Sequence, residues 1–179
     1  MAQTKSSVVP SGYATVTPFI VSNDSARVIA FMAAAFDAKE KERSRSFNLD
    51  GSISHVEVEV GGSVVMLFDA GPDWPETPAF VRVFVEDGDA TYRRALDAGG
   101  RAVTTMTELS FVDRVGRVAD PCGNVWWIQA AAAKVPDDIE ERNRDPEMTQ
   151  AMHYVQESLD REIIRRKGTV LGPGGLTVA

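Results

Sequence analysis

Hydrophobic and polar residues follow the same order of patterns twice along this chain. Apolar stretches at residues 19–21 and 83–85 each run into Asn, Asp, Ser or Gly residues of the kind that cap helices. Apolar residues at helical spacing follow, from Val28 to Phe36 in the first copy and from Tyr92 to Ala98 in the second. Each half is therefore predicted to begin with a strand followed by an amphipathic helix.

Two further strands are predicted in each half, on either side of a turn signal. In the first half, residues 53–60 and 63–69 flank Gly61-Gly62, a strong two-residue hairpin signal. In the second half, residues 112–119 and 124–130 flank Asp120-Pro121-Cys122-Gly123, where Pro fixes φ and Gly allows a positive φ.

An extra strand is expected in each half, at residues 39–48 in the first and as a short, irregular strand around 101–105 in the second. The result is two βαβββ modules, at about residues 13–70 and 79–131, in an α+β domain of residues 13–131.

Strand alternation predicts which side chains share a face. Placing Val60 opposite Ser63 puts only apolar residues on one side of the hairpin, which we expect to pack under the helices. The other side is expected to line a concave cavity and carries His55, Glu57, Glu59, Val64, Met66 and Phe68. In the second half, Val125, Trp127 and Gln129 are predicted to face the cavity, and Arg82 shares one face with Phe80 and Phe84.

Residues 132–179 form a predicted helical extension with a flexible tail. Asp145-Pro146-Glu147 is a typical helix start, and the apolar residues that follow recur at steps of three and four. This stripe consists of Met148, Met152, Val155, Leu159 and Ile163. We expect it to be buried against its own domain or a partner subunit, rather than to close the cavity as a lid.

Composition narrows the functional classes. The net charge of −7 argues against general nucleic-acid binding, which needs a basic face. No apolar run is long enough to cross a membrane and no secretory signal is visible, so a cytoplasmic location is expected. The single cysteine, Cys122, lies in a turn and is interpreted as a turn residue with a free thiol.

Several motifs, in this order, resemble those of the vicinal oxygen chelate superfamily, which includes glyoxalase I, extradiol dioxygenases and the bleomycin- and fosfomycin-resistance proteins. They are most similar to the PhnB-like branch. The motifs are residues 16–21 (VTPFIV), 55–58 (HVEV), 85–87 (VED), 113–116 (DRVG) and 120–128 (DPCGNVWWI). The resemblance implies the glyoxalase/bleomycin-resistance fold, in which the two modules form a curved, mixed sheet that encloses a cavity.

The resemblance also implies where a metal would be held. Metal-dependent members take ligands, usually His and Glu, from the opening and closing strands of each half. The matching positions here are Thr17, Phe68, Phe80 and Gln129. Phe cannot bind a metal, and Thr and Gln are poor ligands for a catalytic divalent ion, so we expect neither a metal nor another cofactor.

His55 and Glu57 are the candidate catalytic residues, because both point to the same side of a strand and either is able to act as a general base. The structural alternative is a polar patch that is ion-paired with Arg82 or Arg114. The aromatic residues are equally compatible with an ordinary core. The candidate ligand-binding set comprises Thr17, Phe19, His55, Glu57, Met66, Phe68, Phe80, Arg82, Trp127 and Gln129.

These observations favour a homodimeric protein that binds a small molecule without metal, for example to sequester an antibiotic or a metabolite, and Glu57 and Glu59 suggest a cationic ligand. One alternative is a metal-independent isomerase or lyase that uses Glu57 or His55 as general base. A metal-dependent lyase or dioxygenase, and a regulatory protein that acts through its tail helix, are further alternatives. A carboxylate with a raised pKa in a sealed pocket favours an enzyme, whereas a wide, open cleft favours a binder.

Overall fold

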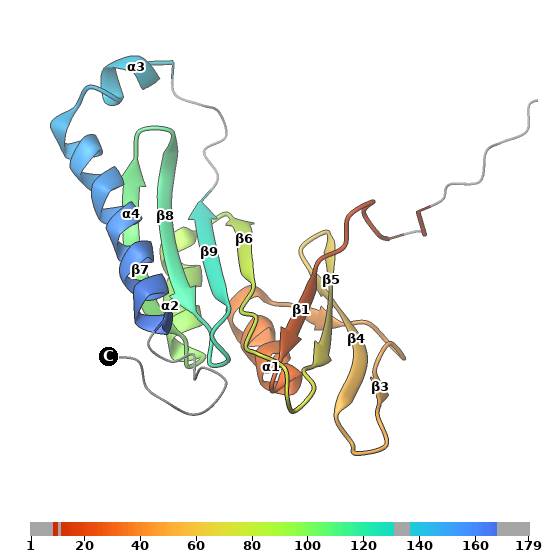
Figure 1. Cartoon of the computed structure of the whole chain (residues 1–179). Helices are drawn as coiled ribbons and strands as arrows, with labels where there is room; N and C mark the ends of the chain where they lie inside the picture. The colour runs from red at the N-terminus through yellow and green to blue at the C-terminus, as the bar shows by residue number, and fades with distance from the viewer. Residues whose placement is uncertain (1–8, 11, 131–136, 168–179) are drawn as a thin grey trace, which may run out of the picture.

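The computed structural model describes residues 9–10, 12–130 and 137–167. The first module contains the expected strand, helix and hairpin (Figure 1). Its elements are β1 (Phe19–Ser22), α1 (Ser25–Phe36), β2 (Lys39–Glu40), β3 (Ser46–Phe47), β4 (Ile53–Val60) and β5 (Ser63–Asp69). The extra strand predicted at residues 39–48 is present only as two short pieces, β2 and β3, which both pair with β4.

The second module repeats this order and is followed by two helices. Its elements are β6 (Phe80–Val85), α2 (Gly88–Asp97), β7 (Arg101–Leu109), β8 (Val112–Ala119) and β9 (Val125–Ala130), and the extension contains α3 (Ile139–Arg142) and α4 (Pro146–Lys167). Strand β7 is longer than predicted, and its register against β8 shifts three times. The prediction of an irregular strand is therefore confirmed, whereas its predicted length was too short.

Each module forms its own mixed sheet, and the two sheets lie side by side (Figure 1). The strand order is β1-β5-β4-β2 in the first sheet and β6-β9-β8-β7 in the second. The hairpin registers match the prediction, because Val60 pairs with Ser63 and Glu57 with Met66. The α+β fold of two βαβββ modules is confirmed, with the two sheets not closed into a barrel within the chain.

Both modules bury their helix-covered faces in one shared core. Trp126, on the α2 side of β9, is fully buried and lies 6.1 Å from the Phe31 ring and 5.0 Å from the Phe36 ring of α1. Its indole Nε1 donates to Asp120 Oδ2 at 3.0 Å. Asp120 Oδ1 also accepts from the backbone N–H groups of Cys122 and Asn124, which confirms its predicted role in the turn.

Helix α4 lies along β7, on the face of the second sheet that is opposite α2 (Figure 1). It begins at Pro146, as predicted, and covers its own domain. The predicted apolar stripe is buried only in part. Val155 is 3 % exposed, whereas Met152 and Ile163 are 39 % and 42 % exposed. Polar residues Ser158 and Glu162 are buried instead, because β7 and β8 offer them hydrogen-bonding and charged partners.

Within the described part of the chain, no helix is both long enough and apolar enough to span a membrane.

Candidate functional site

Apart from Thr17, which precedes β1, the predicted site residues lie on the sheet faces that are turned away from α1 and α2, which we call the distal faces. The first-sheet distal face carries Phe19, His55, Glu57, Met66 and Phe68. The second-sheet distal face carries Phe80, Arg82, Phe84, Arg117, Trp127 and Gln129. Each face is held in place by the core on its opposite side, so the side chains project from rigid strands rather than from loops.

Glu57 is the centre of a hydrogen-bonded cluster on the first-sheet distal face. The Tyr13 hydroxyl donates to Glu57 Oε2, and Lys41 Nζ lies 3.2 Å from the same oxygen. Lys41 also donates to the Tyr13 hydroxyl at 2.7 Å, and His55 Nε2 lies 3.4 Å from Glu57 Oε1. The predicted ion pair of Glu57 with Arg82 or Arg114 is wrong, because Lys41 takes that place and Arg114 pairs with Asp89 of α2.

These contacts control the charge of Glu57. The hydrogen bond from Tyr13, aided by Lys41 and His55, lowers the pKa of Glu57, although burial acts in the opposite direction. The carboxylate is therefore stabilised in its ionised form and is a weaker base than an isolated Glu. The negative charge is largely balanced within the cluster.

Aromatic rings continue this face beside Glu57. Phe19 lies 6.4 Å from the His55 ring and 5.8 Å from the Phe68 ring, and Phe68 lies 6.1 Å from Trp74. Phe19 and Trp74 are 52 % and 57 % exposed, so these rings form an accessible aromatic surface rather than a core. Such a surface is able to stack against a planar or apolar molecule.

The second-sheet distal face combines aromatic rings with two arginines. Arg82 and Arg117 flank Trp127 on the neighbouring strands β6 and β8. Their guanidinium carbons lie 4.3 Å and 3.9 Å from the centroid of the Trp127 ring. Phe80 and Phe84, on either side of Arg82, are 59 % and 64 % exposed.

Helix α4 fixes the buried member of this pair. Arg117 is only 2 % exposed, and its Nη1 donates to the Val155 carbonyl at 2.6 Å and to Thr104 Oγ1 at 3.1 Å. Burial, together with the nearby charge of Arg82, lowers the pKa of Arg117 to about 10. Arg117 therefore remains a cation at neutral pH, held rigidly beside Trp127.

The side chains at the four metal-ligand positions are engaged in the fold or lack donor atoms. The Thr17 hydroxyl donates to the Ala14 carbonyl at 3.4 Å, Phe68 packs against Phe19 and Trp74, and Gln129 is 9 % exposed. Two phenyl rings, a hydroxyl and an amide do not fit a catalytic divalent ion. Among the described residues, no group of three or more His, Cys, Asp and Glu side chains is placed to hold a metal.

A groove of about 440 Å³ runs along the seam between the two modules. Its walls come mostly from the β4–β5 turn, from the segment before β1 and from β6, and valine is their commonest residue. Of the predicted ligand-binding residues, Arg82 lines this groove. Its volume lies within the range of small-molecule sites.

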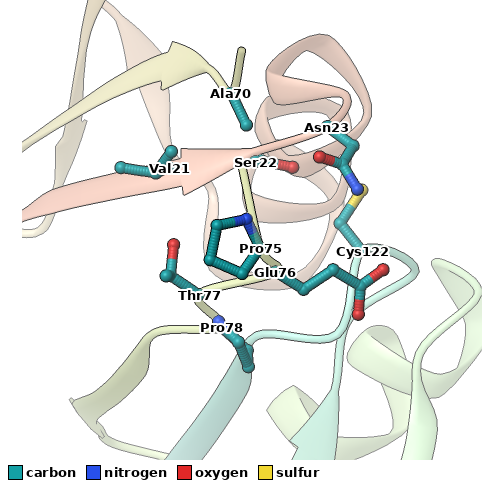
Figure 2. A pocket seen from close by; sticks show the side chains of 9 residues that line it. All are labelled: Val21, Ser22, Asn23, Ala70, Pro75, Glu76, Thr77, Pro78 and Cys122. Atoms are coloured by element: carbon teal, nitrogen blue, oxygen red, sulfur yellow. The ribbon is translucent and has the colours of Figure 1, made fainter. Parts of the chain in front are cut away.

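Cys122 lies at a smaller pocket, of about 20 Å³, between β1 and the turn before β9. Figure 2 shows its thiol beside Asn23, with the segment from Pro75 to Pro78 forming the opposite wall. This volume is enough for about one water molecule. Burial raises the pKa of Cys122, so the thiol is held in its protonated, unreactive form, in agreement with a turn residue.

Nine of the ten predicted ligand-binding residues form two groups, one on each sheet, and Thr17 belongs to neither. Phe19, His55, Glu57, Met66 and Phe68 form the first group, while Phe80, Arg82, Trp127 and Gln129 form the second. In the described part of the chain, no ring contact, hydrogen bond or ion pair joins the two groups. We call these two groups the candidate half-sites.

Sequence reasoning missed Tyr13, Lys41, Trp74 and Arg117. Tyr13 is 44 residues from Glu57, and no local pattern connects the two. Arg117 had a usable signal: counting back across the Asp120 turn from Val125 pairs Ala119 with Val125 and Arg117 with Trp127.

Comparisons with known proteins agree on one family. The profile of the Glyoxalase/Bleomycin resistance protein/Dioxygenase superfamily matches residues 13–128. An uncharacterized protein from Mycobacterium bovis, Mb0911c, is 35 % identical over 122 residues, which are 62 % of this chain and 79 % of that protein.

Solved structures of two family proteins share the fold. The PhnB protein from Bacillus cereus is 18 % identical, with a TM-score of 0.51, and the match covers 66 % of this chain and 100 % of that one. The fosfomycin resistance protein FosX from Listeria monocytogenes is 13 % identical, with a TM-score of 0.54, and the match covers 67 % and 94 %.

Proposed function

The chain belongs to the Glyoxalase/Bleomycin resistance protein/Dioxygenase superfamily, and on that premise we propose that it binds a small molecule without a metal ion. The observation that carries this proposal is the set of exposed aromatic side chains on the two distal faces: Phe19, Trp74, Phe80 and Phe84 are each more than half exposed. Exposed aromatic side chains that gather on one face of a sheet are typical of interaction sites.

The aromatic faces support a binding role in two ways. Their rings offer stacking surfaces, and the charged groups beside them, Glu57 with Lys41 and Arg82 with Arg117, fix the orientation of a bound molecule. The residues at the four metal-ligand positions support a metal-independent role, because two of them have no donor atom. Sequestration of an antibiotic or a metabolite fits these features.

We also propose that two chains associate as a homodimer. Each chain presents two half-sites on separate sheets, and an enclosed cavity requires one half-site to face another. Contact between apolar surfaces of the two copies around the cavity would stabilise such a pair. Sedimentation equilibrium should report twice the chain mass of 19.5 kDa, whereas a single 19.5 kDa species at micromolar concentration would count against the dimer.

The alternative, a metal-independent enzyme with Glu57 or His55 as general base, has less support. A carboxylate acting as base at neutral pH benefits from a raised pKa, but Tyr13 and Lys41 lower that of Glu57. The same contacts suit a residue that orients a ligand. The expected cationic ligand at Glu57 is also less favoured, because Lys41 already neutralises the carboxylate.

A screen of small molecules by thermal shift, followed by calorimetric titration, tests the binding function. We expect aromatic compounds to bind, and Phe80→Ala to weaken their binding by about tenfold, since one stacking surface is lost. Phe111→Ala is the matched control, because Phe111 is also exposed but lies in the turn between β7 and β8. A screen without ligands, or equal losses in both variants, would sink the proposal.

A further inference from the structure

The second-sheet distal face holds two positive charges without a carboxylate to balance them. Within the described residues, neither Arg82 nor Arg117 has an ion pair, although the chain as a whole carries a net charge of −7. A buried cation is costly unless it is paired, and a second cation beside it adds to that cost. This arrangement needs an explanation beyond packing.

The internal contacts of Arg117 compensate its burial only in part. Its Nη1 donates to a carbonyl and a hydroxyl, and the guanidinium stacks on Trp127, which is a favourable cation–π contact. Its Nε, however, and the neighbouring Trp127 Nε1 are buried without an acceptor in the described part of the chain. A positive potential therefore remains at the surface of Trp127.

Arg82 extends this positive potential to a position that a ligand in solvent can reach. Its side chain is exposed, it lies over the same Trp127 ring, and Phe80 and Phe84 flank it on the same face of β6. A guanidinium that makes no hydrogen bond within the described residues and lies between two exposed rings matches a molecule that carries a negative group on an aromatic body. Arginine suits this role because its planar fork binds carboxylates through two parallel hydrogen bonds.

We propose that the second-sheet distal face is a subsite for an aromatic anion, with Arg82 binding the anionic group. Phe80 and Phe84 contact the aromatic body, and Arg117 acts as a positioning residue that holds Trp127 and adds positive charge. Helix α4 belongs to this subsite, because its Val155 carbonyl fixes Arg117. This assignment rests on the proposed binding function and gives its ligand a charge and a chemical class.

Three probes of nearly equal shape separate charge from aromatic contact: benzoate, benzamide and benzamidine. Titration of the full chain by calorimetry should show benzoate binding at least about tenfold more tightly than benzamide and benzamidine. Added salt should weaken the binding of benzoate more than that of benzamide, because only benzoate is held by a charge–charge interaction, which salt screens.

Arg82→Met removes the guanidinium while keeping an unbranched apolar side chain, and its exposed position makes misfolding unimportant. It should reduce benzoate affinity by about tenfold and leave benzamide affinity unchanged. Arg93→Met is the matched control, because Arg93 is exposed on α2, on the far side of the sheet, and this variant should bind benzoate like the unaltered chain.

The outcomes distinguish the two levels of the proposal. Equal binding of all three probes, preference for benzamidine, or an unaffected Arg82→Met variant overturns the anion subsite while the binding function stands. If no probe binds although the wider screen yields ligands, the anion subsite also falls. Failure of both experiments overturns the binding function itself.

Discussion

The two distal faces occupy the same place in two repeats of one module, yet they differ in charge and cover. On the first sheet, a carboxylate, Glu57, is balanced by Lys41 and Tyr13 and borders an open aromatic surface. On the second sheet, Arg82 and Arg117 stack on Trp127 without a carboxylate in the part of the chain that the structure describes, and α4 covers one side.

This difference shows that the repeated βαβββ pattern determines the backbone but not the chemistry of each face. Successive side chains of a strand point to opposite faces of the sheet, so every second residue lies on the distal face and does not pack in the core. These residues can therefore differ between the two modules without changing the backbone. Glu57 on the first face is neutralised internally, whereas the two arginines on the second face have no carboxylate partner among the described residues. The two faces are therefore expected to respond differently to substitution.

The largest loss of stability is expected from a substitution where α4 contacts the second sheet. Glu162 is 3 % exposed on its side chain and contacts Arg101, Arg165 and Arg166 at 2.6, 3.0 and 2.7 Å. Glu162→Gln leaves these arginines without their anion and should lower the free energy of unfolding by about 3 kcal/mol. Urea denaturation measures the loss.

The equivalent change on the first face serves as the comparison. Glu57→Gln should cost only about 1 kcal/mol, since the cluster is partly open to water and Tyr13 and Lys41 can turn to solvent. Equal losses for the two variants would show that the faces are not energetically distinct.

Acid should weaken the packing of α4 on the second sheet before it unfolds the rest of the domain. Burial alone would raise the pKa of Glu162, but hydrogen bonds from Arg165, Arg101 and Arg166 outweigh it and lower the pKa from 4.5 to about 2. The folded value lies below the unfolded one, so the contribution is complete above about pH 4.5 and is lost as the pH falls toward 2. This contribution of ionised Glu162 to the free energy of unfolding is about 3 kcal/mol.

Hydrogen exchange of α4 amides between about pH 5 and about pH 2, which spans the unfolded and folded pKa values of Glu162, measures this loss. The Glu162→Gln variant lacks the titrating group and should lose less stability across the same range. A helix whose protection relative to the core does not change with acid would contradict the assigned role of Glu162.

The smallest loss of stability is expected from Tyr13→Phe. Loss of the hydroxyl should raise the pKa of Glu57, because the Tyr13 hydrogen bond is the main cause of its lowered value. Stability should fall by about 1 kcal/mol or less. Carbon-detected NMR titration of the Glu57 carboxyl reports the change, and an unchanged pKa would mean that Lys41 and His55 alone hold the charge.

Much of the fold was predictable from the sequence because short-range signals determine it. Gly61-Gly62 set the β4–β5 register, and that register correctly placed Glu57 opposite Met66. The Asp120 turn, the helix start at Pro146 and the division into two modules were predictable for the same reason.

The remaining features depend on contacts between distant segments. The apolar stripe of α4 predicted burial of Met152 and Ile163, but Arg101, Thr104 and Arg117 favour the polar side of the helix. Tyr13 and Lys41 reach Glu57 from outside its strand, which no pattern of apolar spacing records. Strand alternation predicted which residues of β4, β5, β6 and β9 share a face, whereas the balance of charge on each face was not predictable.

The central claim is that this chain works without a metal ion, and elemental analysis paired with calorimetric titration of Ni, Zn, Mn and Fe(II) tests it most directly. We predict no stoichiometric metal in the purified protein and no tight binding of any of the four ions. One tightly bound ion per chain, lost on substitution of His55, Glu57 or Gln129, would contradict the account and make metal-dependent chemistry the leading function.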